Sequence, residues 1–593
     1  MLETSESQRQ TKPQDLRLSE RQVPELSESL ARLQDSADQL DPEGCKQRTL
    51  FSTLTKRALK KAQNLLTTDP SDWQNRTMIH SYLKGRASLA FYSHVYYLLE
   101  KDAAACEITT RSARLIYRSL AFRRMLAEGT LPPEHDSQGQ RLDQTFYSHF
   151  FATVRLPGTH EDSYVNFPSS DHLLVICRGQ FFVVHGLSLG ASEAQWRSCL
   201  QDIMTRATSQ SYSPGTWTAL PRSEWAAVRS TLRSRASEAQ AMDLMESSVL
   251  CIALEPDITP KDRTDTMRKL SIESPEHRWF DKSHQLIIFA DGTAGIQRDH
   301  TLLDGHLTAF YAAYLYQFQE SIPSPAQNPL TWESLNFTLP QQLVEHYQGA
   351  CAYLAQLRSQ FWMYSWDLPA LDPQALRTLG LSPDFIVQLL IHCAAYELNG
   401  RFQSVSESVH MRHTRRGRYD SLLTLTSEMK TLVEELSVTQ DSRSTSLPSL
   451  ERFAAAAAAH RNLVKAGKRG FSPMLHITAL LQHSESKITQ QLEAGTIVWG
   501  SHLRLHDEGF RRSLFCEITT SDPGYVPGLE LSGFTDTWAA VVGISYLVKP
   551  SCTSFFIKAD GPVRKQAQGF PEHMQLSFER ISKLWQSLEE ETR

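Results

Sequence analysis

The sequence predicts an α/β protein in which helices pack on mixed β-sheets. Helical and strand-like patterns alternate along the chain without a strict β-α-β repeat, which favours mixed rather than all-parallel sheets. A length of 593 residues exceeds one compact domain. Two large α/β domains fit this length, although about 150 residues per domain would permit up to about four. The 41% hydrophobic and 21% charged residues are typical of a globular protein.

Composition excludes several classes of partner. The formal net charge of −5 gives no field that would favour nucleic acid or an anionic membrane. No apolar run approaches the roughly 18 residues of a membrane span. Residues 1–20 are polar and partly acidic, unlike a signal or transit peptide, and are predicted to be a disordered tail. We therefore expect a cytoplasmic protein, working as a monomer.

The cysteines and histidines give no metal-binding pattern. The 9 cysteines are scattered singly along the chain. None forms a Cys-x-x-Cys pair or a Cys/His set with zinc spacing. The sequence therefore predicts reduced, buried thiols, no metal site and no tightly bound cofactor.

Strand and helix patterns can be placed along much of the chain. Residues 172–187 predict two buried strands around a polar turn, and residues 285–299 predict a second pair around an Asp291-Gly292 turn. Residues 437–449 are typical of a linker. Helical periodicity occurs at residues 24–33, 47–66, 79–99, 307–318 and 384–398.

One short pattern indicates chemistry. Residues 299–305 read Asp-His-Thr-Leu-Leu-Asp-Gly. The pKa of histidine lies near neutrality, which suits His300 to act as a general base. Asp304, four residues later, could orient the imidazole or hold the loop through an ion pair. Gly305 allows close approach of backbone or ligand. Taken alone, the pattern favours a structural histidine at a helix entrance over a catalytic one.

The surrounding sequence resembles the carnitine/choline acyltransferase family. Residues 277–282 read His-Arg-Trp-Phe-Asp-Lys and precede a strand pair and Asp-His-Thr, as the family's Trp-Phe-Asp-Lys stretch precedes its catalytic histidine. The wider group of CoA-dependent acyltransferases, including peptide-synthetase condensation domains, shares His-x-x-x-Asp-Gly. Further matches occur in family order: Pro-x-Leu-x-x-x-Leu at 24–30, Tyr-Leu-x-x-Arg at 82–86, Arg-Leu-Pro-Gly with a later Asp at 155–162, and Leu-Ser-Pro-Asp-x-x-x-Gln at 381–388.

The resemblance covers about residues 20–590 and implies both a fold and a reaction class. It implies two similarly folded α/β domains, each a mixed sheet flanked by helices, with an active-site tunnel between them. Residues 87–340 would form the domain that carries the catalytic histidine. Residues 21–86 together with 341–593 would form the other, which carries the acceptor and CoA elements. His300 would be the general base, Asp304 would orient or support it, and Arg155 would support the catalytic loop.

The acceptor elements depart from the family pattern. Ser406 stands where the carnitine enzymes have Tyr in Tyr-Glu-Ser, with Glu407 retained, and Tyr419 stands where they have Thr. Pro473 aligns with the Arg that holds the acceptor carboxylate. A buried carboxylate without that guanidinium loses a charge-assisted pair. The sequence therefore argues against carnitine, and no clear cation site replaces the lost residues for choline.

The elements that would stabilise the oxyanion have also changed. Ser532-Gly533-Phe534 aligns with the family's Ser-Thr-Ser, so the last hydroxyl is absent. Loss of one oxyanion donor typically lowers the rate by ~10²–10³. Ser532, Thr535 or a backbone N–H would have to act instead.

The CoA side has lost part of its phosphate-binding pattern. Arg377 is the basic residue that closely precedes Ser382 and Asp384, where the family has lysines for the nucleotide 3′-phosphate. Gly543 lies in the segment that matches the glycine-aromatic wall of the pantetheine tunnel. A carrier-protein thioester, which offers pantetheine without the adenosine 3′-phosphate, is therefore a plausible donor beside acyl-CoA.

These observations together predict an acyltransferase. It would move an acyl group from a CoA or carrier-protein thioester to the hydroxyl of a small-molecule acceptor other than carnitine, in a setting such as polyketide-type specialised metabolism. Three alternatives stay open: a carnitine O-acyltransferase with a remodelled site, a cyclase or condensation catalyst, and a catalytically dead binding protein.

Overall fold

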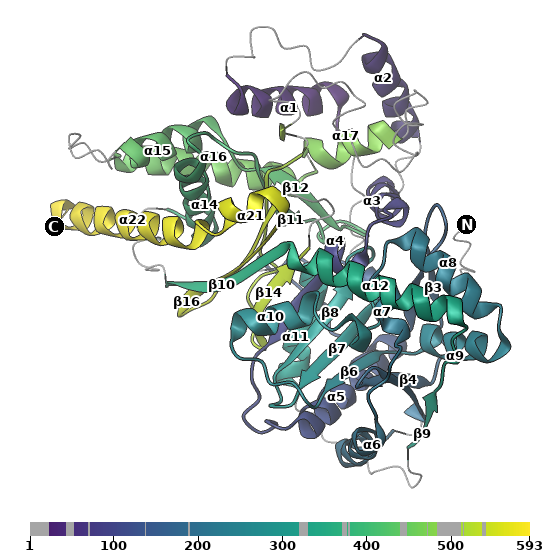
Figure 1. The fold of residues 1–593 in the computed structure, drawn as a ribbon. Helices are drawn as coiled ribbons and strands as arrows, with labels where there is room; N and C mark the ends of the chain where they lie inside the picture. The colour runs from purple at the N-terminus through teal and green to yellow at the C-terminus, as the bar shows by residue number, and fades with distance from the viewer. Residues whose placement is uncertain are drawn as a thin grey trace.

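The computed structural model places most of the chain in two mixed sheets with helices packed on them (Figure 1). The predicted tail 1–20 and most of the predicted linker 437–449 lie outside the described residues. The structure describes residues 23–42, 53–68, 72–136, 138–187, 190–318, 330–370, 376, 380–438, 448–470, 472–482, 512–513, 515–535 and 541–592.

The larger sheet has eight strands. Pairing of β4 with β6 and of β6 with β7 is parallel, and the other neighbours are antiparallel, so the sheet is mixed as predicted. In order across the sheet the strands are β14 (Leu529–Phe534), β1 (His94–Leu99), β8 (Ala294–Asp299), β7 (His284–Phe289), β6 (Cys251–Glu255), β4 (His172–Cys177), β5 (Gln180–His185) and β9 (Thr331–Leu335).

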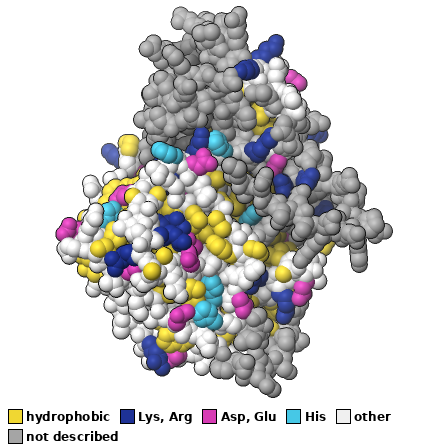
Figure 2. Space-filling model, turned by 90° about the vertical axis from the view of Figure 1, so that its right-hand side faces the viewer, with side chains coloured by type: hydrophobic (Ala, Val, Ile, Leu, Met, Phe, Trp, Pro, Cys, Tyr) yellow, Lys and Arg dark blue, Asp and Glu magenta, His cyan; other side chains and the backbone are white. Residues whose placement is uncertain are grey.

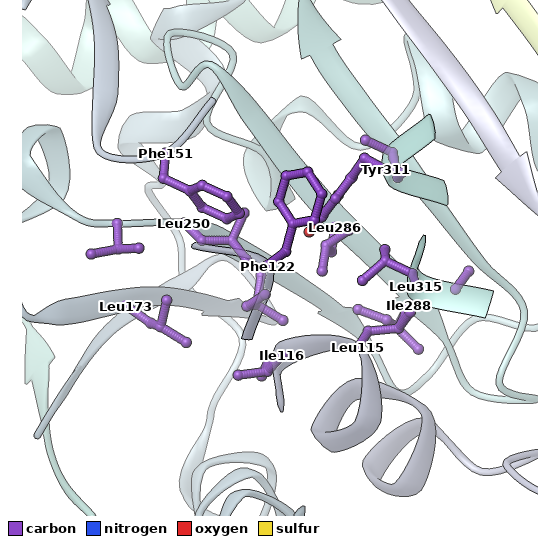
Figure 3. Close-up of a cluster of buried hydrophobic side chains, with 14 of the residues drawn as sticks. Leu115, Ile116, Phe122, Phe151, Leu173, Leu250, Leu286, Ile288, Tyr311 and Leu315 are labelled. Atoms are coloured by element: carbon purple, nitrogen blue, oxygen red, sulfur yellow. The ribbon is translucent and has the colours of Figure 1, made fainter. Parts of the chain in front are cut away.

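Helices cover both faces of this sheet. One face packs on α5 (Ile108–Glu128), α6 (Glu193–Arg206) and α11 (Gly305–Gln317). Figure 3 shows this cluster, to which α5 contributes Phe122 and Ile116, the sheet contributes Leu173 and Leu286, and α11 contributes Tyr311. The other face packs on α7 (Pro214–Thr218), α8 (Arg222–Arg233), α9 (Ala236–Ser247), α10 (Arg263–Ser271) and α12 (Gln341–Ser359).

The smaller sheet has six strands and is also mixed. Strands β11–β13 and β13–β15 pair in parallel. The order is β10 (Phe361–Pro369), β16 (Cys552–Asp560), β15 (Val542–Val548), β13 (Ile518–Ser521), β11 (Val405–His410) and β12 (Tyr419–Leu423). Its core packs on α14 (Pro383–Asn399), α15 (Ser427–Val438), α16 (Leu450–Lys468) and α22 (Phe570–Thr592).

The remaining elements are short or lie beside the smaller sheet. A fourth buried cluster joins α17 to the N-terminal helices (Figure 1, top). These elements are α1 (Leu26–Leu40), α2 (Thr53–Thr68), α3 (Trp73–Lys84), α4 (Leu89–Tyr92), α17 (Pro473–Gln482), α21 (Arg564–Ala567), and the strand pair β2 (Thr153–Leu156) and β3 (Ser163–Asn166).

Two elements of segment 341–593 belong with the larger sheet. Strand β14 pairs with β1, and α12 packs beneath the larger sheet, where the Tyr347 hydroxyl lies 3.0 Å from Thr216 Oγ1. The hydroxyls of Ser532 on β14 and Ser545 on β15 are 2.6 Å apart and link the two sheets. Strand β14 and helix α12 thus lie with the larger sheet, while the domain division at residue 340 stays a prediction.

The predicted strand pairs are present, and one predicted helix is wrong. β4–β5 and β7–β8 form the expected antiparallel hairpins. Residues 79–99, predicted to be one helix, instead contain the end of α3, the short α4 and strand β1. All six residues of β1 are buried, so its sequence His-Val-Tyr-Tyr-Leu-Leu lacks the alternation that would distinguish a strand from a buried helix.

Charged side chains on the surface, the hydropathy of the helices and the cysteine thiols are three further features of the described residues. Figure 2 shows acidic and basic side chains interspersed over the described part of one face. None of the described helices has the length and hydropathy needed to cross a bilayer. The eight cysteines in the described residues are unpaired as expected, but Cys106 and Cys351 are exposed rather than buried.

Candidate active site

His300 lies in the turn that joins β8 to α11. β8 ends at Asp299, and α11 begins at Gly305 with Asp304 at its N-cap position. The Asp304 carboxylate makes no capping hydrogen bond to the helix, because it is turned toward the other half of the protein. A Cβ on Gly305 would lie 3.2 Å from Pro523 Cβ, so the close approach expected here is observed.

A buried arginine from the smaller sheet holds this turn. Arg418 Nε and Nη2 donate to the two oxygens of Asp304, each at 2.8 Å. The same guanidinium donates to the carbonyl of Thr301 at 2.7 Å and to that of His300 at 3.0 Å. Arg418 is completely buried. It therefore fixes the β8–α11 turn of one half of the protein to the β11–β12 loop of the other.

The hydrogen bond of the imidazole is made to the backbone. His300 Nδ1 lies 3.1 Å from the Leu303 carbonyl oxygen and 3.7 Å from Asp304 Oδ1. Because a carbonyl only accepts, Nδ1 carries the proton in the neutral ring and Nε2 carries the lone pair. Of the two roles predicted for Asp304, the geometry matches loop support through an ion pair.

Arg155 braces the same turn from behind. Its Nη1 donates to Thr301 Oγ1 at 2.8 Å, and its Nη2 donates to the Tyr82 carbonyl at 2.6 Å. Its Nε pairs with Asp162 at 2.7 Å. Burial opposes ionisation of Asp162, but neighbouring arginines, Arg222 foremost, hold the pKa of this carboxyl below its usual range. Arg155 therefore contacts the turn that carries His300, and its supporting role stays a prediction.

Two tyrosines cover the His300 ring. The Tyr419 ring stacks on it at a centroid distance of 5.2 Å, and the Tyr82 ring lies 5.6 Å away. The two tyrosine hydroxyls are hydrogen-bonded to each other at 2.8 Å. Burial lowers the pKa of His300 to about 4, with Arg298 adding to the effect and Asp304 opposing it. The imidazole is therefore neutral at physiological pH, as a base must be.

A cavity of about 260 Å³ reaches His300. Five of the predicted site residues line it, namely His300, Asp304, Asp384, Glu407 and Tyr419. The other lining residues are Gly305, His306, Ser408, Val409, His410, Arg412, Arg418, Leu422, Val464, Ser521, Asp522, Pro523 and Gly524.

One wall of the cavity carries a carboxyl cluster. The Tyr546 hydroxyl lies 2.6 Å from Asp384 Oδ1 and is also hydrogen-bonded to Glu407 Oε1. His460 Nε2 lies 2.9 Å from Asp384 Oδ2. Ligand atoms of Asp384, Glu407 and His460 lie within 4.8 Å of one another, close enough to hold a metal ion. Glu407 and Asp384, predicted to serve the acceptor and the CoA respectively, share one hydroxyl.

Basic side chains also line the cavity. The His306 and His410 rings are 4.2 Å apart, and burial lowers the pKa of His306 to about 3 and of His410 to about 2. Arg412 is buried and pairs with Glu134 at 2.5 Å. Both imidazoles are therefore uncharged, and the Glu134 carboxylate balances the charge of the Arg412 guanidinium.

The predicted acceptor residues Ser406 and Pro473 are buried but do not line this cavity. Ser406 lies in β11, where its carbonyl accepts from Thr520 Oγ1 at 3.0 Å. Pro473 begins α17.

The predicted oxyanion residues lie on or next to β14. Phe534 pairs with Val95, and Thr535 Oγ1 donates to the His94 carbonyl at 2.9 Å. Ser532 is hydrogen-bonded to Ser545. None of the three lines the described cavity.

The remaining predicted CoA-side residues have structural contacts. Ser382 caps α14, its Oγ accepting from Phe385 N–H at 3.2 Å. Gly543 lies within the smaller sheet between Thr519 and Lys558. Arg377 lies outside the described residues.

Several residues at the site were not selected from the sequence. Tyr82 begins the Tyr-Leu-x-x-Arg motif that carried part of the resemblance, and Arg418 directly precedes Tyr419 in the acceptor element, so these positions were the available signal. His460 has no carboxylate at motif spacing, because its partner Asp384 is distant in sequence. Tyr546 ends the segment 542–546 that matched the glycine-aromatic element, whereas Asp522 gave no signal, since only the fold brings it to the cavity.

Comparison with known proteins gives the family. Residues 22–575 match the model of the choline/carnitine O-acyltransferase family. Choline O-acetyltransferase of Danio rerio is 23% identical over 65% of this chain and 64% of its own length. Peroxisomal carnitine O-octanoyltransferase of Homo sapiens is 25% identical over 54% of this chain and 55% of its own length. These alignments thus span less than two thirds of the relatives. Because the family model matches nearly the whole chain, this protein belongs to the choline/carnitine O-acyltransferase family.

Proposed function

We propose that this protein transfers an acyl group from a thioester to the hydroxyl of an acceptor other than carnitine. The observation that carries the proposal is the neutral imidazole of His300, whose Nδ1 is held by the Leu303 carbonyl and which lines a cavity. Family membership gives the reaction class. A neutral base with a fixed tautomer is what deprotonation of a hydroxyl requires.

The reaction would proceed without a covalent enzyme intermediate. His300 Nε2 takes the proton of the acceptor hydroxyl as its oxygen forms a bond to the thioester carbonyl carbon. The C–S bond of the tetrahedral intermediate then breaks, and the imidazolium returns the proton to the leaving thiolate. Asp304 and Arg418 keep the turn in place, and the stacked Tyr419 restrains the ring.

The donor of the hydrogen bond to the oxyanion is proposed from the hydroxyl protons that are not already used in other hydrogen bonds. Thr535 commits its hydroxyl proton to the His94 carbonyl. Ser532 and Ser545 are bonded to each other, which uses one of their two hydroxyl protons and leaves the other free. The serine pair is therefore the better candidate, and the backbone near Phe534 is the alternative.

Tyr419 supports an acceptor other than carnitine. Its ring stacks on His300 and its hydroxyl is bonded to Tyr82, so this pair occupies the space beside the base. Glu407 and Asp384 line the cavity with no arginine from the position of Pro473 to hold a carboxylate. The acceptor is thus a small hydroxyl compound without the carboxylate of carnitine.

The donor is acyl-CoA or an acyl carrier protein, and both offer the same pantetheine thioester. We also propose that the protein works in polyketide-type biosynthesis and lies in the cytoplasm, and the amino-acid sequence is the support for both points.

The test is a panel of donors and acceptors with product detection by mass spectrometry. Acetyl-CoA and S-acetylpantetheine would each be combined with carnitine, choline and uncharged alcohols. The proposal expects esters of uncharged alcohols. Acylcarnitine as the main product would overturn the acceptor assignment and favour the carnitine O-acyltransferase alternative.

A further inference from the structure

Asp162 is a buried carboxylate that three arginines share. Arg155 and Arg222 each donate from Nε to its Oδ2 at 2.7 Å. Arg86 donates from Nη2 to Oδ1 at 2.8 Å, and the Gly158 N–H donates to the same oxygen at 3.2 Å. The side chain of Asp162 has no exposed surface. A carboxylate has about four acceptor sites, so these donors saturate Asp162 from within the protein.

The arginines around Asp162 depend on it for charge compensation. Arg222 has a second carboxylate, since its Nη1 lies 2.6 Å from Asp281. For Arg155 the second carboxylate is Asp299, at the longer distance of 3.5 Å. Because Arg155 and Arg222 bond to the same oxygen, loss of the Asp162 charge would leave two buried guanidinium groups close together without their shared counter-charge. Such groups repel each other, so Arg155 would move.

Arg155 contacts three neighbours of the His300 imidazole. Its Nη1 donates to Thr301 Oγ1 at 2.8 Å and lies 3.5 Å from Asp299 Oδ1. Thr301 and Asp299 flank His300 in the chain. The Nη2 of Arg155 donates to the carbonyl of Tyr82, whose ring lies 5.6 Å from the imidazole. One guanidinium thus contacts the residue before His300, the residue after it and one of the tyrosines that cover it.

The pairing with Asp162 sets the direction in which Arg155 points. A guanidinium is a rigid planar fork, so a hydrogen bond at Nε fixes the plane in which Nη1 and Nη2 lie. This plane carries Nη1 to the turn after β8 and Nη2 to the end of α3. We propose that Asp162 is a positioning residue for His300 and acts through Arg155. The proposal rests on the proposed function, because it takes His300 as the base.

The position of the imidazole matters because proton transfer requires a fixed distance between the base and the acceptor hydroxyl. A displacement of about 1 Å, caused by a change far from the chemistry, can lower a rate by about 10²-fold. Asp162 does not line the cavity that reaches His300. Its loss should therefore act on kcat rather than on KM.

Two variants interrupt these contacts at different points. Asp162→Asn keeps the size of the side chain and removes its charge. Thr301→Val removes only the oxygen that accepts from Arg155 Nη1, so the ion pairs of Asp162 stay intact. Because this second change is milder, it keeps the test decisive even if Asp162→Asn does not fold.

Glu255→Gln is the matched control. Glu255 is 1% exposed and pairs with Arg278 at 2.5 Å and with His277 at 2.7 Å. Strand β6 pairs in parallel with β7, whereas β8 pairs antiparallel with it, so Glu255 at the end of β6 and His300 after the end of β8 lie at opposite edges of the sheet. The control therefore removes the charge of a buried, paired carboxylate without reaching the turn that carries His300.

Nitrogen NMR of isotope-labelled histidine side chains tests the positioning without a substrate. The His300 signals are identified by their absence in His300→Gln. In wild type they should report a neutral ring with its proton on Nδ1, which is bonded to the Leu303 carbonyl. Asp162→Asn and Thr301→Val should shift these signals toward a mixture of the two tautomers, while Glu255→Gln should leave them unchanged.

The two variants have separate contradicting results in the same spectra. Unchanged His300 signals in folded Asp162→Asn would overturn the role of Asp162. Unchanged signals in Thr301→Val would overturn the path through Arg155. A shift of the same size in Glu255→Gln would assign the effect to general loss of stability and would also overturn the proposal.

Steady-state thiol release from acetyl-CoA or S-acetylpantetheine, with the best hydroxyl acceptor, tests the consequence for the reaction. Asp162→Asn and Thr301→Val should lower kcat by about tenfold or more and leave KM unchanged. Glu255→Gln should keep the wild-type kcat, and an equal loss there would contradict the proposal. Absence of transfer by wild type would refute the proposed function, whereas the imidazole signals would still decide the role of Asp162.

Discussion

Replacing Arg418 with methionine should destabilise the protein more than any exposed arginine change on the same loop. The substitution removes a bidentate pair at 2.8 Å to Asp304 and two hydrogen bonds to carbonyls of the β8–α11 turn. Because Arg418 is completely buried, Asp304 would be left as an uncompensated charge. Removing one partner of a buried ion pair costs about 3–5 kcal/mol.

The measurement is urea unfolding followed by tryptophan fluorescence. Arg416→Met is the matched control, since Arg416 pairs with Asp72 at 3.2 Å on the surface with 45% of its side chain exposed. Exposed pairs of this kind contribute about 0–1 kcal/mol. The double variant Asp304→Asn/Arg418→Met should be less destabilised than Arg418→Met alone, because it leaves no unpaired charge. Equal stability of Arg418→Met and Arg416→Met would refute the reasoning.

Three further predictions concern the same site. The pKa of His300 is about 4 in the folded protein and about 6.5 in the unfolded chain, so the unfolded chain binds more protons between these values and the free energy of unfolding falls as the pH drops through them. His300→Gln should therefore lose about 3 kcal/mol less stability than wild type by pH 4. Identical pH profiles of the two proteins in urea unfolding would contradict this. Tyr419→Phe loses the 2.8 Å bond to Tyr82 but keeps the ring, so unfolding free energy should fall by about 1 kcal/mol, and an unchanged value would argue against the bond. Gly417→Ala places a Cβ 1.9 Å from the Met411 carbonyl oxygen and should lower the melting temperature. Gly349→Ala is the control, because nothing lies within 4 Å of the added Cβ, and it should not lower the melting temperature. Equal decreases in the melting temperatures of the two variants would contradict the crowding argument.

Local patterns predicted the elements that depend on local sequence. The hairpins β4–β5 and β7–β8 follow from apolar runs around turn residues, and α14 follows from Ser382-Pro383 at its start. Strand β1 was missed because burial on both faces removes the alternation by which a strand is recognised. Strand β14 could not be assigned to a sheet, since its partner β1 is more than 400 residues away in sequence.

The candidate site likewise combines residues that local sequence predicts with contacts that only the fold creates. His300 and Asp304 were found because their spacing is local, and the resemblance gave their neighbours. The partner of Asp304 was not identified, because the pair joins residues 114 positions apart. Glu407 and Asp384 were each selected but assigned to different substrates, since only the fold reveals that Tyr546 lies between them.

Acyl transfer by His300→Ala tests the central claim most directly. The measurement is thiol release from S-acetylpantetheine or acetyl-CoA with the best hydroxyl acceptor, compared with wild type and with His185→Ala. His185 is an exposed histidine paired with Glu333 at 2.9 Å, away from the described cavity. The account predicts that His300→Ala loses at least about 10²-fold in kcat while folding normally, and that His185→Ala keeps its rate. Wild-type thiol release by His300→Ala would contradict the assignment of His300 as the base.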